Sequence, residues 1–139
     1  PFDFREPMPI SKHVRSSADN QLTYGGGYDH NWVVDEAVAS EPRLMAHLED
    51  PVSGRTMTVL SNQPGLQFYS GNFFDGTTSG KAGKSYGIGD AIALEPQMFP
   101  DAVNQPSFAS VVLRPGQIYA NMIMWRFGVS RLFSPNING

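Results

Sequence analysis

The sequence has 139 residues, 40% hydrophobic and 17% charged, with a formal net charge of -3. This length is enough for one domain with a hydrophobic core, and the scattered charges form no basic patch for nucleic acid or an anionic membrane. No apolar run could span a bilayer, and the absence of cysteine excludes disulfides, thiolate nucleophiles and cysteine-ligated metals. We therefore expect neither nucleic acid nor membrane as a partner, while a cytoplasmic and an exported location both stay open.

The first 31 residues are predicted to be mostly irregular, because three prolines interrupt any helix. This segment leads into the sequence GGGYDHNW at residues 25–32. Three consecutive glycines allow positive φ angles and close approach of the backbone to other groups. The segment predicts a tight turn that delivers Asp29, His30 and Asn31 at the start of a strand.

The rest of the chain shows many short strand patterns separated by turn residues. In no segment do apolar residues recur at the 3.6-residue spacing of a helix over three turns. The sequence therefore predicts an all-β fold, either a sandwich or a barrel. The last strand, which carries Trp125 and Phe127, is expected to lie in the core. Residues 75–90 are predicted to be a mobile surface loop, because they lack the spacing and the following helix of a phosphate-binding loop. The predicted strands are residues 32–38, 43–49, 57–60, 65–73, 91–99, 110–113 and 117–130.

The segment LEPQMFPDAVNQPSF, residues 94–108, places a single carboxylate, Glu95, in an apolar strand pattern. A carboxylate that loses hydration in a fold acquires a raised pKa and can act as a base near neutral pH. The alternative is a structural glutamate in a salt bridge. Gln97 shares the predicted face of Glu95, and Gln67 is placed on another strand. Two amides beside a carboxylate suit the hydroxyls of a sugar, which need donors and acceptors together.

Asp29 and His30 stand at a junction of loop and strand, where ligand contacts concentrate. The alternative is an aspartate that caps a turn and a histidine that packs among other side chains. Together with Glu95 they could ligate a metal. Because neither His13 nor His47 has a convincing ligand spacing with them, the pattern disfavours a metal site.

The sequence resembles the aldose 1-epimerase (galactose mutarotase) family in six blocks, which occur in the order that the family has them. A single block of this kind would be weak, but six in order are specific. The blocks are PFDFREP at 1–7, GGGYDHNWVV at 25–34, GLQFYSGNFFDGT at 65–77, GKSYG at 83–87, ALEPQMFPDAVNQPSF at 93–108 and LRPGQIY at 113–119.

This resemblance implies a large antiparallel β-sandwich and an enzyme that interconverts the α and β anomers of aldohexoses such as galactose and glucose. A base removes the proton of the anomeric hydroxyl while an acid protonates the ring oxygen, and no cofactor is needed. The resemblance implies that Glu95 is the base and that Asp29 and Gln67 bind the sugar. His30 and Gln97 are further, weaker candidates for sugar binding.

The resemblance also implies what the sequence lacks. The general acid of the family is a histidine in an upstream N-H-x-Y-F-N block, which is absent here. We therefore expect residues 1–139 to be the C-terminal portion of a single mutarotase-like domain without an internal boundary. Its partners would be an aldose and the N-terminal part of the same protein, and by itself the chain could be inactive.

Two other functions stay open. One is a sugar-binding or interaction domain of the same fold without catalysis. The other is a hexose-6-phosphate mutarotase, which would need a basic cluster for the phosphate. Lys81, Lys84 and Arg126 are the candidates for such a cluster, but their positions in the sequence show no grouping.

Overall fold

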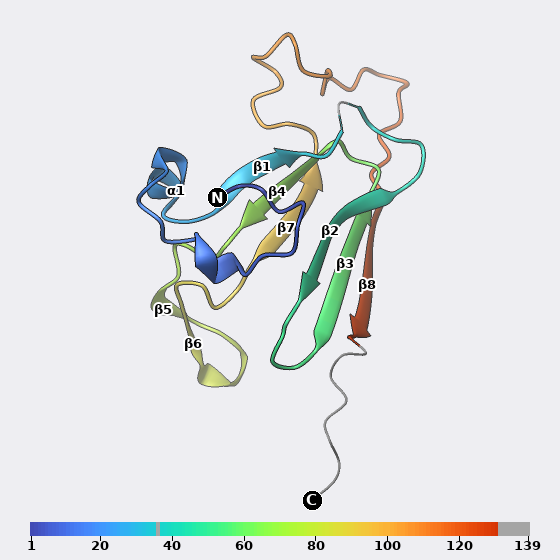
Figure 1. Cartoon of the computed structure of the whole chain (residues 1–139). Helices are drawn as coiled ribbons and strands as arrows, with labels where there is room; N and C mark the ends of the chain where they lie inside the picture. The colour runs from blue at the N-terminus through green and yellow to red at the C-terminus, as the bar shows by residue number, and fades with distance from the viewer. Residues whose placement is uncertain (36, 131–139) are drawn as a thin grey trace, which may run out of the picture. The chain divides into compact units, whose positions relative to one another are not determined.

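The computed structural model describes residues 1–35 and 37–130 (Figure 1). The prediction of an all-β fold is confirmed, because these residues form antiparallel strands and little helix. No helix among them is long and apolar enough to cross a membrane. The strands are β1 (Asp29–Val33), β2 (Arg43–Glu49), β3 (Arg55–Ser61), β4 (Gly65–Tyr69), β5 (Asp75–Ser79), β6 (Ser85–Gly87), β7 (Ala93–Gln97) and β8 (Ile123–Val129); the helices are α1 (Asn20–Gly25) and the 3-10 turns η1 (Ile10–Lys12) and η2 (Lys81–Gly83).

The chain divides into two compact units. Unit 1 consists of Pro1–Trp32 and Leu66–Glu95, and unit 2 consists of Val33–Gly65 and Pro96–Gly139. That residues 1–139 belong to a single domain without an internal boundary stays a prediction.

The sheet of unit 1 has the strand order β1-β4-β7, and neighbouring strands run in opposite directions (Figure 1). At one end of the β1–β4 pair, the backbone N–H of Ser70 donates to the carbonyl of Tyr28 at 3.0 Å. At the other end, the N–H of Val34 donates to the carbonyl of Pro64 at 2.9 Å. The same number of residues separates the two bonds on each strand, so Asn31 lies across from Gln67.

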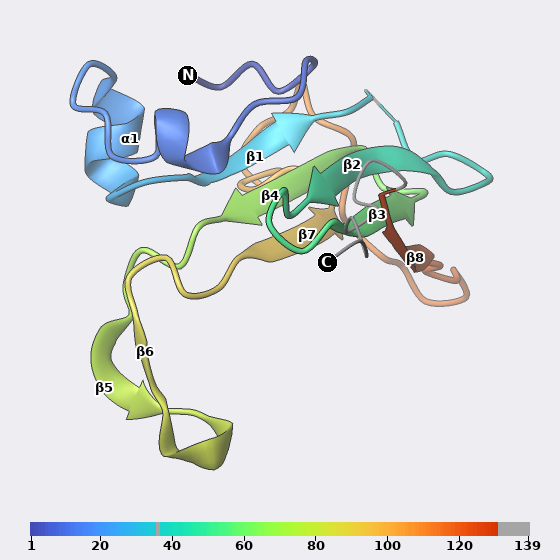
Figure 2. The same ribbon diagram turned by 60° about the horizontal axis from the view of Figure 1, so that its bottom comes forward.

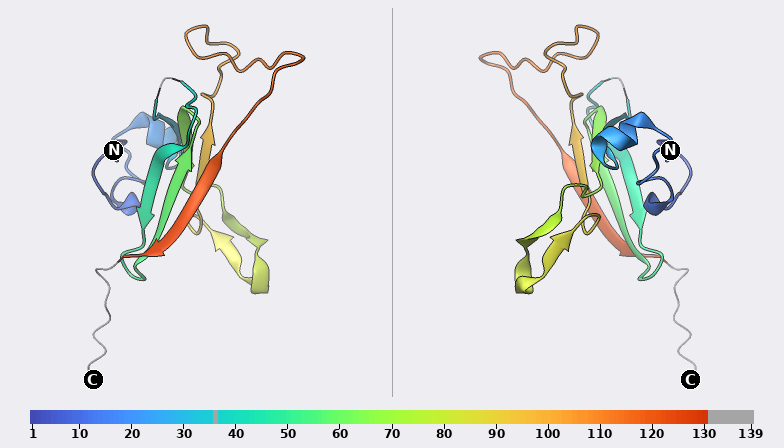
Figure 3. Two further views of the ribbon diagram at one scale, coloured as in Figure 1. Left: turned by 90° about the vertical axis from the view of Figure 1, so that its right-hand side faces the viewer. Right: turned by 90° about the vertical axis from the view of Figure 1, so that its left-hand side faces the viewer.

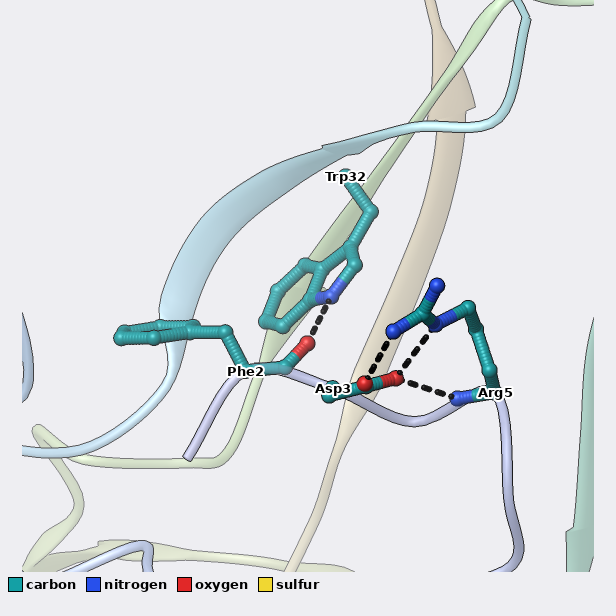
Figure 4. Close-up of polar contacts among 4 residues, drawn as sticks. All are labelled: Phe2, Asp3, Arg5 and Trp32. Carbon is teal, nitrogen blue, oxygen red and sulfur yellow. Dashed lines mark hydrogen bonds and ion pairs between the residues drawn. The ribbon is translucent and has the colours of Figure 1, made fainter.

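One face of this sheet carries the core of unit 1, built from Leu22, Tyr28 and Phe68. Trp32 packs against it, and its indole Nε1 donates to the carbonyl of Phe2 at 2.9 Å (Figure 4). The Tyr28 hydroxyl donates to the carbonyl of Pro1 at 2.8 Å, and burial raises the pKa of this phenol. These bonds hold the N-terminal segment, in which exposed Arg5 and Asp3 also form an ion pair (Figure 4).

Helix α1 is a feature that the sequence pattern missed within residues 1–31. Its N-cap is Asp19, whose Oδ1 accepts from the backbone N–H of Gln21 at 2.8 Å. Gly26, with φ of 61°, ends the helix in the left-handed conformation. A helix of six residues is too short to show the apolar period on which the prediction relied.

The sheet of unit 2 has the order β2-β3-β8, with antiparallel pairs throughout (Figure 3). Strand β2 has the predicted bounds, and a bulge between Leu44 and Ala46 shifts its register against β3 and leaves Leu44 exposed. The prediction that the last strand lies in the core is wrong. Trp125 is 50% exposed and Phe127 78% exposed, because β8 is an edge strand with a face that the described residues leave open.

Residues 75–90 do not form the predicted loop. Strands β5 and β6 pair there as an antiparallel hairpin, with η2 between them (Figure 2). Asp75 stabilises the first strand, because its Oδ1 accepts from the backbone N–H and the hydroxyl of Thr77 at 2.9 and 2.5 Å. These bonds hold the pKa of the Asp75 carboxyl below its usual value.

Candidate active site

The face of the β1-β4-β7 sheet opposite the core is polar. Side chains alternate between the two faces of a strand. Because Phe68 and Leu94 pack in the core, their neighbours Gln67 and Glu95 belong to the opposite face. Asp29 lies on that face too, since its Oδ1 accepts a hydrogen bond from Gln67. The structure thus brings Asp29, Gln67 and Glu95 to one surface, which we call the polar face.

The Asp29–Gln67 pair is a ready-made partner for hydroxyl groups. Gln67 Nε2 donates to Asp29 Oδ1 at 2.8 Å and so fixes the orientation of both side chains. Asp29 Oδ2 and Gln67 Oε1 accept no bond from another described residue. Both are acceptors, and a sugar hydroxyl can donate to each of them.

Glu95 is exposed, with half-buried Leu94 before it and buried Pro96 after it. The expected loss of hydration of this carboxylate is therefore not seen within the described residues. The alternative of a structural glutamate in a salt bridge finds no support either, because no described residue makes a hydrogen bond or ion pair with the Glu95 carboxylate. An open carboxylate is free to contact a ligand.

His30 is not brought to the polar face. Its ring packs edge-on to Phe2 and Trp32, at centroid distances of 4.9 and 6.4 Å. Its Nδ1 accepts from the backbone N–H of Asp29 at 3.0 Å. Here the alternative of a packed histidine describes what the structure shows, and the imidazole holds the backbone of Asp29.

Two further residues on this face are not among the site residues predicted from the sequence. Asn31 lies across from Gln67, and its Oδ1 is buried without a hydrogen-bond partner among the described residues. By the same register Tyr69 lies across from Asp29, and its ring stacks on Phe73 at 6.0 Å. Asn31 is two residues from Asp29 and Tyr69 two from Gln67, so the two-residue alternation was the signal that could have found them.

The family model described as aldose 1-epimerase matches residues 1–124. The chain belongs to the aldose 1-epimerase family. It is 40% identical over 129 residues to the galactose mutarotases of Rattus norvegicus and Homo sapiens, and the match covers 93% of this chain and 35% of each relative. It is 31% identical over 128 residues to the aldose 1-epimerase of Escherichia coli strain K12, over 91% of this chain and 36% of the relative. The chain thus spans about a third of the length of the curated relatives that it matches.

The family match includes the whole polar face, since Asp29, Gln67 and Glu95 all lie within residues 1–124. Family membership also supports the predicted β-sandwich, with which the antiparallel sheets are consistent. Gln97, at the end of β7, is half-buried and falls within unit 2. Across residues 1–35 and 37–130, no three histidine, aspartate or glutamate side chains are grouped to hold a metal ion.

Proposed function

We propose that the protein acts as an aldose 1-epimerase, which interconverts the α and β anomers of aldohexoses such as galactose. The observation that carries this proposal is the exposed Glu95 carboxylate on the same sheet face as the hydrogen-bonded pair of Asp29 and Gln67. The names of the relatives, galactose mutarotase and aldose 1-epimerase, support the same reaction.

In the proposed reaction Glu95 removes the proton of the anomeric hydroxyl. The electron pair of that O–H bond forms the carbonyl at C1, and the bond between C1 and the ring oxygen breaks as an acid protonates this oxygen. Rotation about the C1–C2 bond turns the other face of the aldehyde to the returning hydroxyl, and the reverse proton transfers give the other anomer. Each proton is returned, so no external reactant is consumed.

Asp29 and Gln67, which also lie on the polar face, bind the sugar in this proposal. Asp29 Oδ2 and Gln67 Oε1 accept from sugar hydroxyls, while the bond between the two side chains keeps them in place. His30 supports the backbone of Asp29, and a contact between Gln97 and the sugar stays a prediction. We assign the protonation of the ring oxygen to a residue outside the polar face, and the resemblance points to an upstream histidine block for it.

The proposed reaction is tested by polarimetry of freshly dissolved α-D-galactose, with the full-length protein that carries this chain. We expect the optical rotation to relax faster than in buffer. Binding of galactose without acceleration would instead identify a sugar-binding domain. Acceleration that is confined to galactose 6-phosphate would identify the phosphate-specific enzyme.

We further propose that this chain has a partner, namely the part of the family domain that the chain does not span. This partner covers an apolar surface of unit 2. Trp125, Phe127 and Val129 lie on one face of β8, where each is at least half exposed. An apolar row of this kind on an edge strand is a site for association with other chain segments. The match covers only 35% of the relative's length. The remaining part of such a domain is large enough to cover this surface.

Replacing Phe127 by Lys should weaken the binding of the co-expressed remainder of the domain, because burying the ammonium is costly. Met124→Lys, on the other face of the same strand, is the matched control and should leave binding unchanged. Co-elution in size-exclusion chromatography measures the effect. Equal binding by both variants would contradict the proposal, and formation of a dimer by the chain alone would assign the surface to a second copy.

A further inference from the structure

The loop after β4 carries two buried polar side chains that the proposed reaction does not use. Ser70 is 3% exposed and Asn72 6% exposed. Buried polar groups are costly unless they are hydrogen-bonded, and well-satisfied networks of them hold a local structure in one conformation. Both side chains bond to the glycine segment that precedes Asp29.

Asn72 clamps this segment at two points. Its Nδ2 donates to the carbonyl of Gly25 at 2.8 Å and to the carbonyl of Tyr28 at 2.9 Å. Its Oδ1 accepts from the Ser70 hydroxyl at 2.6 Å, and Ser70 Oγ accepts from the backbone N–H of Tyr28 at 3.0 Å. The backbone is therefore held on both sides of the intervening Gly26 and Gly27.

The shape of the glycine turn is matched to this clamp. Gly27 has a φ of 138°, and a Cβ on it would lie 2.4 Å from Asn72 Oδ1. The amide of Asn72 thus fills the space that a side chain would take. Arg15 adds contacts beside Asn72, since its Nη1 donates to the carbonyl of Gly26 and, at 3.5 Å, to Asn72 Oδ1.

We propose that Asn72 is a positioning residue for sugar binding, which acts through Asp29. Asp29 directly follows Tyr28, whose backbone N–H and carbonyl are both held by the side chains of Ser70 and Asn72. The clamp at Tyr28 and the bond from Gln67 together determine where the carboxylate of Asp29 lies. This inference rests on the proposed epimerase function and adds a residue to it that does not touch the sugar.

The test is Asn72→Asp in the full-length protein. The side chain keeps its size, but an oxygen replaces Nδ2, so two donated bonds are lost and the new oxygen faces the carbonyls of Gly25 and Tyr28. We expect the KM for α-D-galactose to rise by about tenfold, the equivalent of one or two lost hydrogen bonds. The value of kcat should change less, because an Asp29 contact present in both ground and transition states affects KM. Polarimetry gives both constants.

Two controls separate positioning from folding. Asn121→Asp makes the same chemical change at an exposed residue and should alter neither constant. In an Asp29→Ala background, Asn72→Asp should raise KM no further, because residues that act through one group are not additive. A lower kcat at unchanged KM would mean only a smaller folded fraction and would overturn the proposal.

A milder variant covers the case in which Asn72→Asp does not fold. Ser70→Ala removes only the hydroxyl that links Asn72 Oδ1 to the N–H of Tyr28, and it should raise KM in the same direction by a smaller factor. If the wild type is active and the folded variants have the same KM as the wild type, the positioning role of Asn72 is wrong. A wild type without anomerase activity would instead overturn the proposed function.

Discussion

Glu95→Gln in the full-length protein is expected to lower kcat for galactose anomerisation by about 10²–10⁴-fold, the usual contribution of a general base. The amide has the shape of the carboxylate but cannot accept the proton of the anomeric hydroxyl. Because the exposed Glu95 carboxylate makes no bond to another described residue, its loss should leave the fold unchanged. Polarimetry of fresh α-D-galactose measures the rate, and circular dichroism monitors the fold.

The matched control is Glu49→Gln, which makes the same change at another exposed glutamate, at the end of β2. This variant should keep the wild-type kcat. If Glu95→Gln keeps it as well, the base is another residue and the proposed mechanism is wrong. A retained sugar affinity in inactive Glu95→Gln would support the separate binding role of Asp29 and Gln67.

Phe68→Ala is expected to lower the free energy of unfolding by about 3–5 kcal/mol, the usual cost of deleting a buried phenylalanine ring. The ring of Phe68 stacks on Tyr28 at a centroid distance of 5.3 Å and also contacts Trp32 at 5.9 Å and Phe4 at 6.1 Å. Its removal would leave a cavity in the centre of the unit 1 core. Urea denaturation followed by tryptophan fluorescence measures the change.

Phe73→Ala is the matched control, because Phe73 is 70% exposed and its ring stacks on Tyr69 alone among the described rings. Loss of one exposed aromatic contact should cost no more than about 1.5 kcal/mol. Similar costs for the two variants would show that Phe68 does not lie in the core that stabilises unit 1.

Much of the strand pattern could be read from the sequence, but strand ends and edges could not. Strand β2 has the predicted bounds, since a turn that contains Asp50 closes it. The strand predicted at residues 32–38 is in fact β1, Asp29–Val33. Aspartate and asparagine have low strand preference, and Asp29 and Asn31 become strand residues here because β1 pairs with the distant β4.

The exposed β8 shows a second limit. Alternating large apolar side chains predict a face that is covered, but they do not say by what. Trp125 and Phe127 carry the pattern of a core strand on an edge strand that the described residues leave open. Whether such a face is covered depends on contacts with other segments and not on the pattern of the strand itself, which is why the prediction of a core strand failed.

By itself the sequence determined the all-β class, the family blocks and the strands that carry Gln67 and Glu95, because these properties depend on residue type and on a two-residue period within one strand. Tertiary structure alone decided which side chains meet. The bond between Asp29 and Gln67 joins residues 38 positions apart, and the clamp of Asn72 on Gly25 joins residues 47 apart. Such contacts depend on which distant strands pair with each other. The residue pattern within a single strand does not specify its partner strand.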